Sequence, residues 1–208
     1  MAYNHFEWRR RLAERTDMST FVTHLTRENS TQNVNDVLYQ IIKDKTLVAS
    51  TTSSGFITGE HGAVCFQDIP LTSICQNVFY EQKKQESFSY YKLRYRALGI
   101  MFSKPYIFNK GGRPVIYDKT EEAKQYLPKD QWWRIVNLNL SDNDKIVDWT
   151  HEREWRVKNN LSFELSEVTL LTIGLSSINY LCSKYKSEFG CELLPQLKGV
   201  VNLETVLY

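Results

Sequence analysis

Residues 148 to 156, Asp148-Trp-Thr-His-Glu-Arg-Glu-Trp-Arg156, are the stretch on which the fold prediction rests. Side chains of a strand alternate between its two faces, so a strand here would place Glu152, Glu154 and Arg156 on one face. Two carboxylates about 6.5–7 Å apart repel by about 0.6 kcal/mol in water and about 2.4 kcal/mol at an effective dielectric of 20. The strand is therefore either an exposed edge with alternating charges or one whose carboxylates have a chemical role and a cation beside them.

The other face of this strand is expected to carry His151, Arg153 and Trp155, with Trp155 fixing the strand against the core. His151-Glu152 begins like the zinc-protease motif H-E-x-x-H, but position 155 is Trp and no second histidine ligand follows. The four histidines are scattered, and no cysteine joins them at metal-ligand spacing. We therefore expect no metal site.

Composition places the chain among globular proteins. It has 208 residues, 42% of them hydrophobic and 13% aromatic, which is enough to bury a core. The N-terminus is polar and no apolar run has the length of a membrane span, so neither a signal peptide nor a membrane partner is expected. The four cysteines form no C-x-x-C pair, and a cytoplasmic location is the expectation.

Short strands and helices alternate irregularly along the chain. Apolar periodicity predicts helices over 5–15, 34–44, 72–92, 121–127 and 176–189. Runs of β-branched and aromatic residues predict strands over 21–26, 46–50, 63–66, 98–102, 114–117, 168–173 and 200–206, whereas 132–138 fits either element. The order favours an α+β fold with a largely antiparallel sheet and flanking helices. One domain over 1–208 is expected, with 1–18 as an N-terminal helical extension.

A basic segment lies between residues 83 and 113. It holds eight Lys and Arg residues and a single acid, Glu86, and aromatic residues including Phe88, Tyr90, Tyr91 and Tyr95 lie among them. Cations mixed with aromatic rings suit phosphate contacts and base stacking. A solvated, charged helix face is the alternative.

Two short patterns could together bind a ribose. His24-Leu25-Thr26 lies on an expected strand, and its imidazole and hydroxyl groups can hydrogen-bond a ribose diol. The Glu152-x-Glu154 pattern supplies a carboxylate that can hold a ribose 2′-hydroxyl and stabilise an oxocarbenium ion, and a second that can deprotonate a nucleophile. Taken alone, His24 is also compatible with a structural role. No phosphate-binding glycine motif and no G-x-S-x-G motif is present.

These residues carry a resemblance to known families. Phe21-Val-Thr-His-Leu-Thr26, the helix 34–42, Leu47-Val-Ala-Ser50 and Ala63-Val-Cys-Phe66 resemble the opening of DarT-type ADP-ribosyltransferase toxins. Further segments, ending with Glu152-Arg-Glu-Trp-Arg156, are similar to the AbiGi-like and DUF2971-like proteins of phage-defence loci. Together the two resemblances cover most of residues 20 to 160. One departure stands at Arg96-Ala97-Leu98, where the first family has Tyr-Gly-x-Gly.

The resemblance implies a split sheet of the ADP-ribosyltransferase type that binds NAD as a substrate, with no metal. By this likeness Glu154 would be the catalytic glutamate and Glu152 its helper. The NAD-binding residues would be His24, Thr26, Arg27, Tyr39, Ser50 and Phe66. Lys92, Arg94 and Arg96 would hold a nucleic acid acceptor.

The resulting hypothesis is a toxin that transfers ADP-ribose to RNA or DNA, in phage defence or in a toxin–antitoxin system with an antitoxin protein as partner. A non-catalytic, partner-binding module on the same fold is the first alternative. An NAD glycohydrolase or a nuclease is the second.

Overall fold

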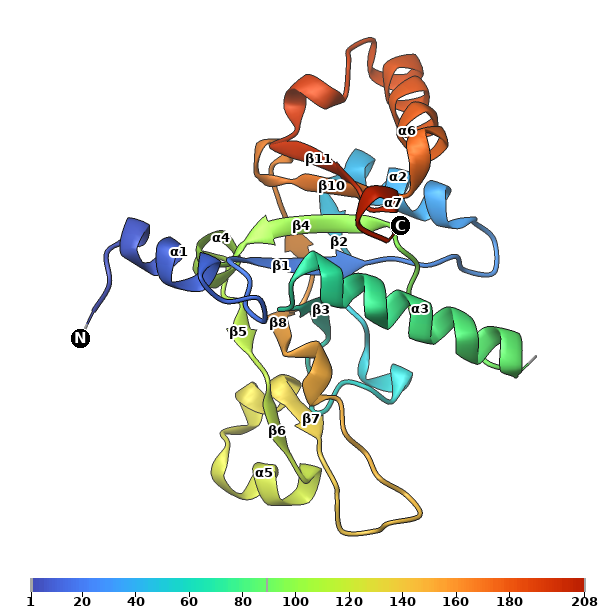
Figure 1. Cartoon of the computed structure of the whole chain (residues 1–208). Coiled ribbons are helices and arrows are strands. Elements are labelled where there is room, and N and C mark those ends of the chain that lie inside the picture. The colour runs from blue at the N-terminus through green and yellow to red at the C-terminus, as the bar shows by residue number, and fades with distance from the viewer. Residues whose placement is uncertain (1, 89, 208) are drawn as a thin grey trace. The chain divides into compact units, whose positions relative to one another are not determined.

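The computed structural model describes residues 2–88 and 90–207, which form two compact units (Figure 1). Unit 1 comprises residues 2–45, 69–103 and 163–207, and unit 2 comprises 46–68 and 104–162. The single domain expected over 1–208 stays a prediction, and its end residues Met1 and Tyr208 lie outside the described residues.

Unit 1 contains four paired strands, in the order β11 (Gly199–Asn202), β10 (Thr169–Thr172), β4 (Gly99–Ser103) and β1 (Phe21–Leu25). The β1–β4 and β4–β10 pairs are antiparallel, whereas β10 and β11 are parallel. Gly99 lies opposite Leu25, where the strands approach so closely that a Cβ atom would lie 2.0 Å from the His24 carbonyl oxygen. A side chain at position 99 would therefore break this pairing.

Helices flank the strands of unit 1: α1 (His5–Ala13), α2 (Val34–Asp44), α3 (Leu71–Ser87), α6 (Gly174–Phe189) and α7 (Glu204–Leu207). The Asn33 side chain caps α2 by accepting bonds from the backbone of Asn35 and Asp36. Helix α3 packs Ile74, Cys75 and Val78 into a core that also contains Met101 and Leu171. In Figure 1, α2 and α6 lie side by side, and Tyr39 of α2 donates a hydrogen bond to Glu188 of α6.

Unit 2 is built on the antiparallel strands β3 (Ala63–Gln67), β8 (Glu154–Lys158) and β5 (Arg113–Pro114), with β8 in the middle. Two smaller pairs are β2 (Thr46–Leu47) with β9 (Leu161–Ser162) and β6 (Ile116–Asp118) with β7 (Ile135–Asn137). The helices are α4 (Lys104–Asn109) and α5 (Thr120–Tyr126). Ile57, Ala63 and Trp133 form a small core.

Short 3-10 turns complete both units: η1 (Thr52–Ser54), η2 (Lys129–Arg134) and η3 (Thr150–Glu152) in unit 2, and η4 (Leu165–Glu167) and η5 (Leu194–Gln196) in unit 1. The fold is mixed α and β with mostly antiparallel strands and flanking helices, which confirms the coarse fold prediction. The segment 132–138, which fitted either element, divides between η2 and β7.

The strand predicted over 46–50 is shortened to β2, the helix predicted to residue 92 ends at Ser87, and three further strand predictions are wrong in part. The run 148–156 does not form one strand, because residues 150–152 are a 3-10 turn, Arg153 is left-handed with φ of 46°, and β8 begins at Glu154. The run 114–117 is divided, since β5 pairs with β8 while β6 pairs with β7. The run 200–206 ends as a strand at Asn202, whose side chain accepts the backbone N–H of Glu204 at the start of α7.

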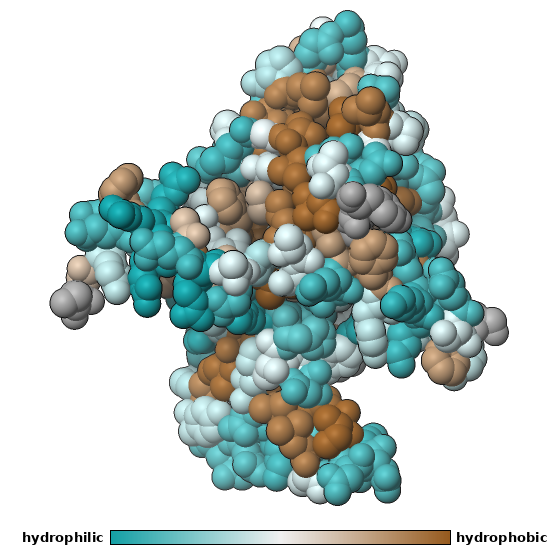
Figure 2. Space-filling model, viewed as in Figure 1, coloured by the Kyte–Doolittle hydropathy of each residue, from teal (hydrophilic) through white to brown (hydrophobic). Residues whose placement is uncertain are grey.

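Hydrophobic residues also reach the surface of unit 1. Figure 2 shows them over β10 and β11, where Val200 is partly exposed, and Leu194 of η5 is exposed as well. Scattered exposed apolar residues are usual in folded proteins.

Candidate functional site

Glu154 and Arg156 form a buried ion pair on one face of β8. Arg156 Nε lies 2.8 Å from Glu154 Oε1, and Nη2 lies 3.2 Å from Oε2, so the contact is bidentate. Both residues are buried, with relative exposures of 8% for Glu154 and 2% for Arg156. The sequence predicted Arg156 as the counter-charge of Glu154 on the same face, and this is confirmed.

Arg156 has no spare hydrogen-bond donor. Besides the two bonds to Glu154, Nη1 donates to the carbonyls of Trp133 and Ile135, and Nη2 donates to the carbonyl of Phe56. A guanidinium has five N–H donors, and these bonds use five. The carboxylate of Glu154 is therefore held in one position by a cation that is itself immobile.

The groups around this pair have shifted pKa values. Burial alone would lower the pKa of Arg156, but the Glu154 carboxylate raises it above its ordinary value. Burial raises the pKa of the Cys65 thiol well above its usual range, and Glu154 adds to this rise. Tyr117 accepts the backbone N–H of Glu154 at 2.7 Å, and its pKa is raised to about 12, chiefly by burial.

Glu152 is not part of β8. It ends the 3-10 turn η3, and the left-handed Arg153 separates it from the strand. Just before the turn, the carboxylate of Asp148 accepts the backbone N–H and the hydroxyl of Thr150. The backbone carbonyl of Glu152 accepts the N–H of Asp68, so the turn is fixed next to the end of β3. The strand expected through Glu152 is therefore wrong, although the Glu152 carboxylate acts on the same neighbours as Glu154 and raises the pKa values of Cys65 and Tyr117.

Three expected NAD-binding residues lie together in unit 1. His24 is on β1, and Thr26 and Arg27 follow the end of that strand. The backbone of Thr26 bonds Leu98 and Arg96, both at 2.8 Å, and Arg27 Nη1 donates to the carbonyl of Leu93 at 2.9 Å. This segment is therefore anchored to residues 93–98.

The other three expected NAD-binding residues have different surroundings. Tyr39 is buried in α2, and its hydroxyl bonds Glu188 at 2.5 Å. In unit 2, Ser50 is exposed and forms a β-bridge with Ala63, while Phe66 is buried on β3. Tyr39 thus has a structural contact that its sequence position did not suggest.

The three expected acceptor-binding residues differ in how their charges are used. Arg94 contacts the fully buried Glu81 through Nε and Nη2, at 3.0 and 2.6 Å. Arg96 forms a bidentate contact with Glu28, at 3.0 and 2.7 Å. Lys92 is exposed. Only Lys92 of the three thus presents its charge to solvent without a carboxylate contact among the residues that the structure describes.

Exposed aromatic and basic residues gather at the C-terminal end of α3. Tyr80 and Phe88 are exposed, and the ammonium group of Lys84 lies 5.5 Å from the centre of each ring. Tyr90 is 85% exposed and its ring centre lies 5.8 Å from that of Phe88. The sequence indicated Phe88 and Tyr90 for this role but also Tyr91 and Tyr95, which are directed inward: Tyr91 bonds Glu81 and Tyr95 is buried.

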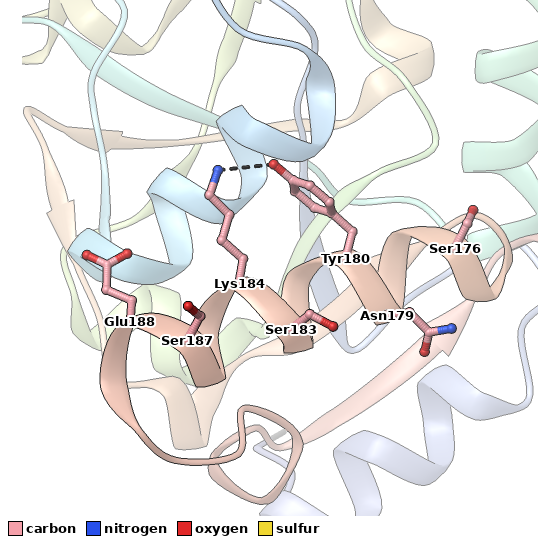
Figure 3. A pocket seen from close by; sticks show the side chains of 7 residues that line it. All are labelled: Ser176, Asn179, Tyr180, Ser183, Lys184, Ser187 and Glu188. Carbon is pink, nitrogen blue, oxygen red and sulfur yellow. Dashed lines mark hydrogen bonds between the residues drawn. The ribbon is translucent and has the colours of Figure 1, made fainter.

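A hollow of about 780 Å³ lies along α6 in unit 1. Figure 3 shows its polar lining, in which Lys184 bonds Tyr180 at 3.0 Å. Lys184 also pairs with Asp36 of α2 at 2.6 Å, and Glu188 pairs with Lys43 at 2.5 Å. These ion pairs connect α6 to α2. None of the residues predicted to be catalytic, to bind NAD or to bind the acceptor lines this hollow.

A second hollow of about 430 Å³ is lined by Arg96, its partner Glu28, and neighbours that include Leu98 and Ile173. It adjoins the segment of Thr26 through the backbone bonds of Arg96 and Leu98. Of the two hollows, this smaller one lies next to residues predicted from the sequence, and it is the better candidate for part of a ligand site.

The described residues contain no group of three or more His, Cys, Asp or Glu side chains arranged to hold a metal ion. None of the helices in residues 2–88 and 90–207 is both long enough and apolar enough to cross a membrane.

Comparison with known proteins adds no relative. No family model, no curated protein and no solved structure matches the chain.

Several neighbours of Glu154 could not be identified from the sequence. Cys65 and Gln67 lie opposite Arg156 and Glu154 in the β3–β8 register, and Tyr117 reaches Glu154 from 37 residues away. The strand predicted over 63–66 ended one residue before Gln67, and only the pairing with β8 brings these residues next to Glu154.

Proposed function

We propose that the chain is an NAD-dependent ADP-ribosyltransferase toxin of the phage-defence or toxin–antitoxin kind, with a nucleic acid as acceptor and a sheet of the ADP-ribosyltransferase type. The observation that carries the proposal is the fixed carboxylate of Glu154, held by Arg156 through two bonds. A carboxylate oriented in advance in a water-poor site stabilises positive charge that develops in a transition state. The resemblance of His24-x-Thr26 and Glu152-x-Glu154 to toxin motifs supplies the substrate class.

In the proposed reaction, the bond between C1′ of the nicotinamide ribose and the nicotinamide nitrogen breaks. The bonding electrons leave with nicotinamide, which becomes neutral, and positive charge develops on the ribose, where Glu154 stabilises it. A lone pair of the acceptor forms the new bond to C1′, and its proton passes to Glu152. The resemblance assigns His24 and Thr26 to the adenosine-side ribose, and Arg27, Tyr39, Ser50 and Phe66 to other parts of NAD.

The acceptor is proposed to be RNA or DNA, bound at the basic segment. Lys92 keeps its role, because its side chain is exposed. Arg94 and Arg96 can bind phosphate only if their ion pairs with Glu81 and Glu28 break. Lys84 and the exposed rings of Tyr80, Phe88 and Tyr90 supply the cation and the stacking surfaces that single strands require.

The test is labelling of RNA, DNA and protein acceptors with biotinylated NAD. Glu154→Gln breaks the buried pair, and Glu154→Asp keeps the charge but draws the carboxylate back by one methylene group. Both variants are expected to lose labelling, and Glu154→Asp by about a hundredfold, because a displacement of about 1 Å has this effect on catalysis. Glu60→Gln, at an exposed glutamate of unit 2, is the matched control and should label normally.

Circular dichroism and thermal unfolding must show that Glu154→Asp is folded. If the folded variant labels as well as wild type, Glu154 is not the catalyst. If wild type labels none of the three acceptors, the transferase proposal is wrong.

A second candidate function is a non-catalytic module that binds a partner such as an antitoxin-like protein. All five N–H donors of Arg156 form hydrogen bonds to residues of unit 2, and this observation favours the second candidate. An ion pair with only a structural role would have the same bonds. This candidate predicts a second chain that co-purifies from cells equally well with wild type and Glu154→Asp, and an absence of NAD labelling in both.

A further inference from the structure

Gln67 has a buried side-chain oxygen without a hydrogen-bond partner. The residue is the last of β3 and is only 6% exposed. Its Oε1 atom is buried and accepts no hydrogen bond among the described residues. Most buried polar side-chain atoms are paired, and an unpaired acceptor costs folding free energy. Such a group calls for a reason, and a ligand that donates a hydrogen bond is one.

The register places Gln67 directly beside Glu154. Gln67 and Glu154 are opposite each other across the antiparallel β3–β8 pair, as are Cys65 and Arg156. Opposite residues share a face of the sheet, and their Cβ atoms lie about 4.5–5.5 Å apart. Phe66 lies opposite Trp155 and belongs to the other face. The unpaired amide oxygen and the Glu154 carboxylate therefore lie on one polar face.

Two acceptors with open positions lie on this face, the Gln67 amide oxygen and the Glu154 carboxylate. The donors of Arg156 are all used, so this guanidinium cannot bind a phosphate without giving up a bond. A carboxylate has about four acceptor positions; Arg156 takes two of those on Glu154, and the Cys65 thiol is a further donor to it, so a position remains for a ligand. A ligand matched to this face thus offers neighbouring O–H donors, as a ribose diol does.

We propose that Gln67 is a substrate-binding residue that accepts a hydrogen bond from a hydroxyl group of the nicotinamide ribose of NAD, next to Glu154. This inference rests on the proposed function. It assigns the two neighbouring acceptors to the two neighbouring hydroxyls of one sugar, and it makes Gln67 part of the selection for ribose over deoxyribose.

The experiment is a double-mutant cycle between protein and ligand, measured as NAD affinity by titration calorimetry. Wild type and the nearly isosteric Gln67→Met are each titrated with NAD and with analogues that lack the 2′ or the 3′ hydroxyl of the nicotinamide ribose. Gln67→Met is expected to bind NAD about tenfold more weakly, the effect of one lost hydrogen bond. The analogue that lacks the contacted hydroxyl should be about tenfold weaker on wild type and no weaker than NAD on Gln67→Met.

Thr172→Val is the matched control. Thr172 lies on β10 in unit 1, is fully buried, and has a hydroxyl oxygen without a partner among the described residues. Both substitutions remove an unpaired buried polar atom, so both should raise the melting temperature of the free protein, but only Gln67→Met should weaken NAD binding.

The outcomes separate the two proposals. If wild type binds NAD and Gln67→Met binds it equally well, or if neither hydroxyl is coupled to Gln67, the role of Gln67 is wrong while the NAD function stands. If wild type itself does not bind NAD, the proposed function fails and the assignment of Gln67 fails with it.

Discussion

Arg94 is bound to the fully buried carboxylate of Glu81 through its side chain and through its backbone N–H, at 2.6 to 3.0 Å. Tyr91 adds a fourth bond to the same carboxylate at 2.8 Å. The pair thereby fixes residues 91–94 against α3. A carboxylate buried in this way depends on all of these donors, because an unpaired buried charge is strongly unfavourable.

Removal of this carboxylate should destabilise the protein. Glu81→Ala is expected to lower the free energy of unfolding by about 3 kcal/mol, at the lower end of the range for buried pairs because Arg94 reaches solvent. Urea denaturation measures the change. Glu86→Ala, at an exposed position on the same helix, is the control and should change the free energy by no more than about 0.5 kcal/mol. Equal effects of the two substitutions would contradict the role of Glu81.

The Glu154–Arg156 pair should show strong coupling. Arg156→Met leaves Glu154 buried and unpaired, and it is expected to cost about 3–5 kcal/mol of stability. Arg156→Met leaves the Glu154 carboxylate without its counter-charge, and Glu154→Gln removes that carboxylate. The double variant should therefore be more stable than Arg156→Met alone. Chemical denaturation of the two single variants and the double variant tests this coupling, and strictly additive losses would rule it out.

Tyr117 should lose its phenol proton at a higher pH than an ordinary tyrosine. Burial raises its pKa from 10.0 to about 12, so the folded protein keeps the phenol proton when the unfolded chain has lost it, and stability should fall as the pH rises through this interval. Absorbance titration of the tyrosines should show a late component that diminishes, but remains, in Tyr117→Phe, since Tyr39 also has its pKa raised to about 12. Tyr117→Phe also leaves the Glu154 N–H unpaired, which should cost about 1–3 kcal/mol.

Lowering the pH should reduce the stability that the Glu28–Arg96 ion pair gives to unit 1. The hydrogen bonds from Arg96 hold the pKa of this carboxyl group below its ordinary value of 4.5. A carboxyl group with a lowered pKa stabilises the fold above pH 4.5, and this contribution is lost as the pH falls through the lower, folded-state value. The difference in melting temperature between wild type and Glu28→Gln should therefore shrink in acid. A difference that stays constant across that range would show that the ion pair contributes nothing.

The acceptor surface is best tested at lysines for which the described residues show no ion pair with a carboxylate. Neutralising Lys83, Lys84 and Lys92 to Gln should weaken RNA and single-stranded DNA binding and reduce the slope of log affinity against log salt by about 0.7 for each lost phosphate contact. Lys129→Gln and Lys145→Gln, at exposed positions of unit 2, are controls. Fluorescence anisotropy at several salt concentrations measures the slope, and an unchanged slope would exclude this surface.

Local sequence signals predicted much of the secondary structure. The helix over 34–44 was predicted with its Asn33 cap, since the apolar period and the capping residue lie within one short segment. The strand prediction for 148–156 was wrong in part because the alternating charges of this run fit a strand. The hydrogen bonds between Asp148 and Thr150 favour a turn instead. Side-chain bonds to the nearby backbone are invisible in an alternation pattern.

The candidate site was less predictable because its partners are distant in sequence. Arg96 seemed available for phosphate, but its partner Glu28 lies 68 residues earlier. Gln67 and Tyr117 come next to Glu154 only through the pairing of β3 with β8 and a contact across 37 residues. Single-sequence patterns specify faces of elements, and tertiary pairing decides which faces meet.

The bonds of Arg156 also bear on the order of folding. Its carbonyl partners Phe56, Ile135 and Trp133 lie 100, 21 and 23 residues away in the chain, and residues 69–103, which belong to unit 1, interrupt the path to Phe56. Closing a loop has an entropic cost that precedes the gain from the contact, so we expect the contact across 100 residues to form late. We expect substitutions at Arg156 to speed unfolding more than they slow folding. The carboxylate of Glu154 would then acquire its fixed orientation only when unit 2 is complete, so a partly synthesised or partly folded chain would lack it.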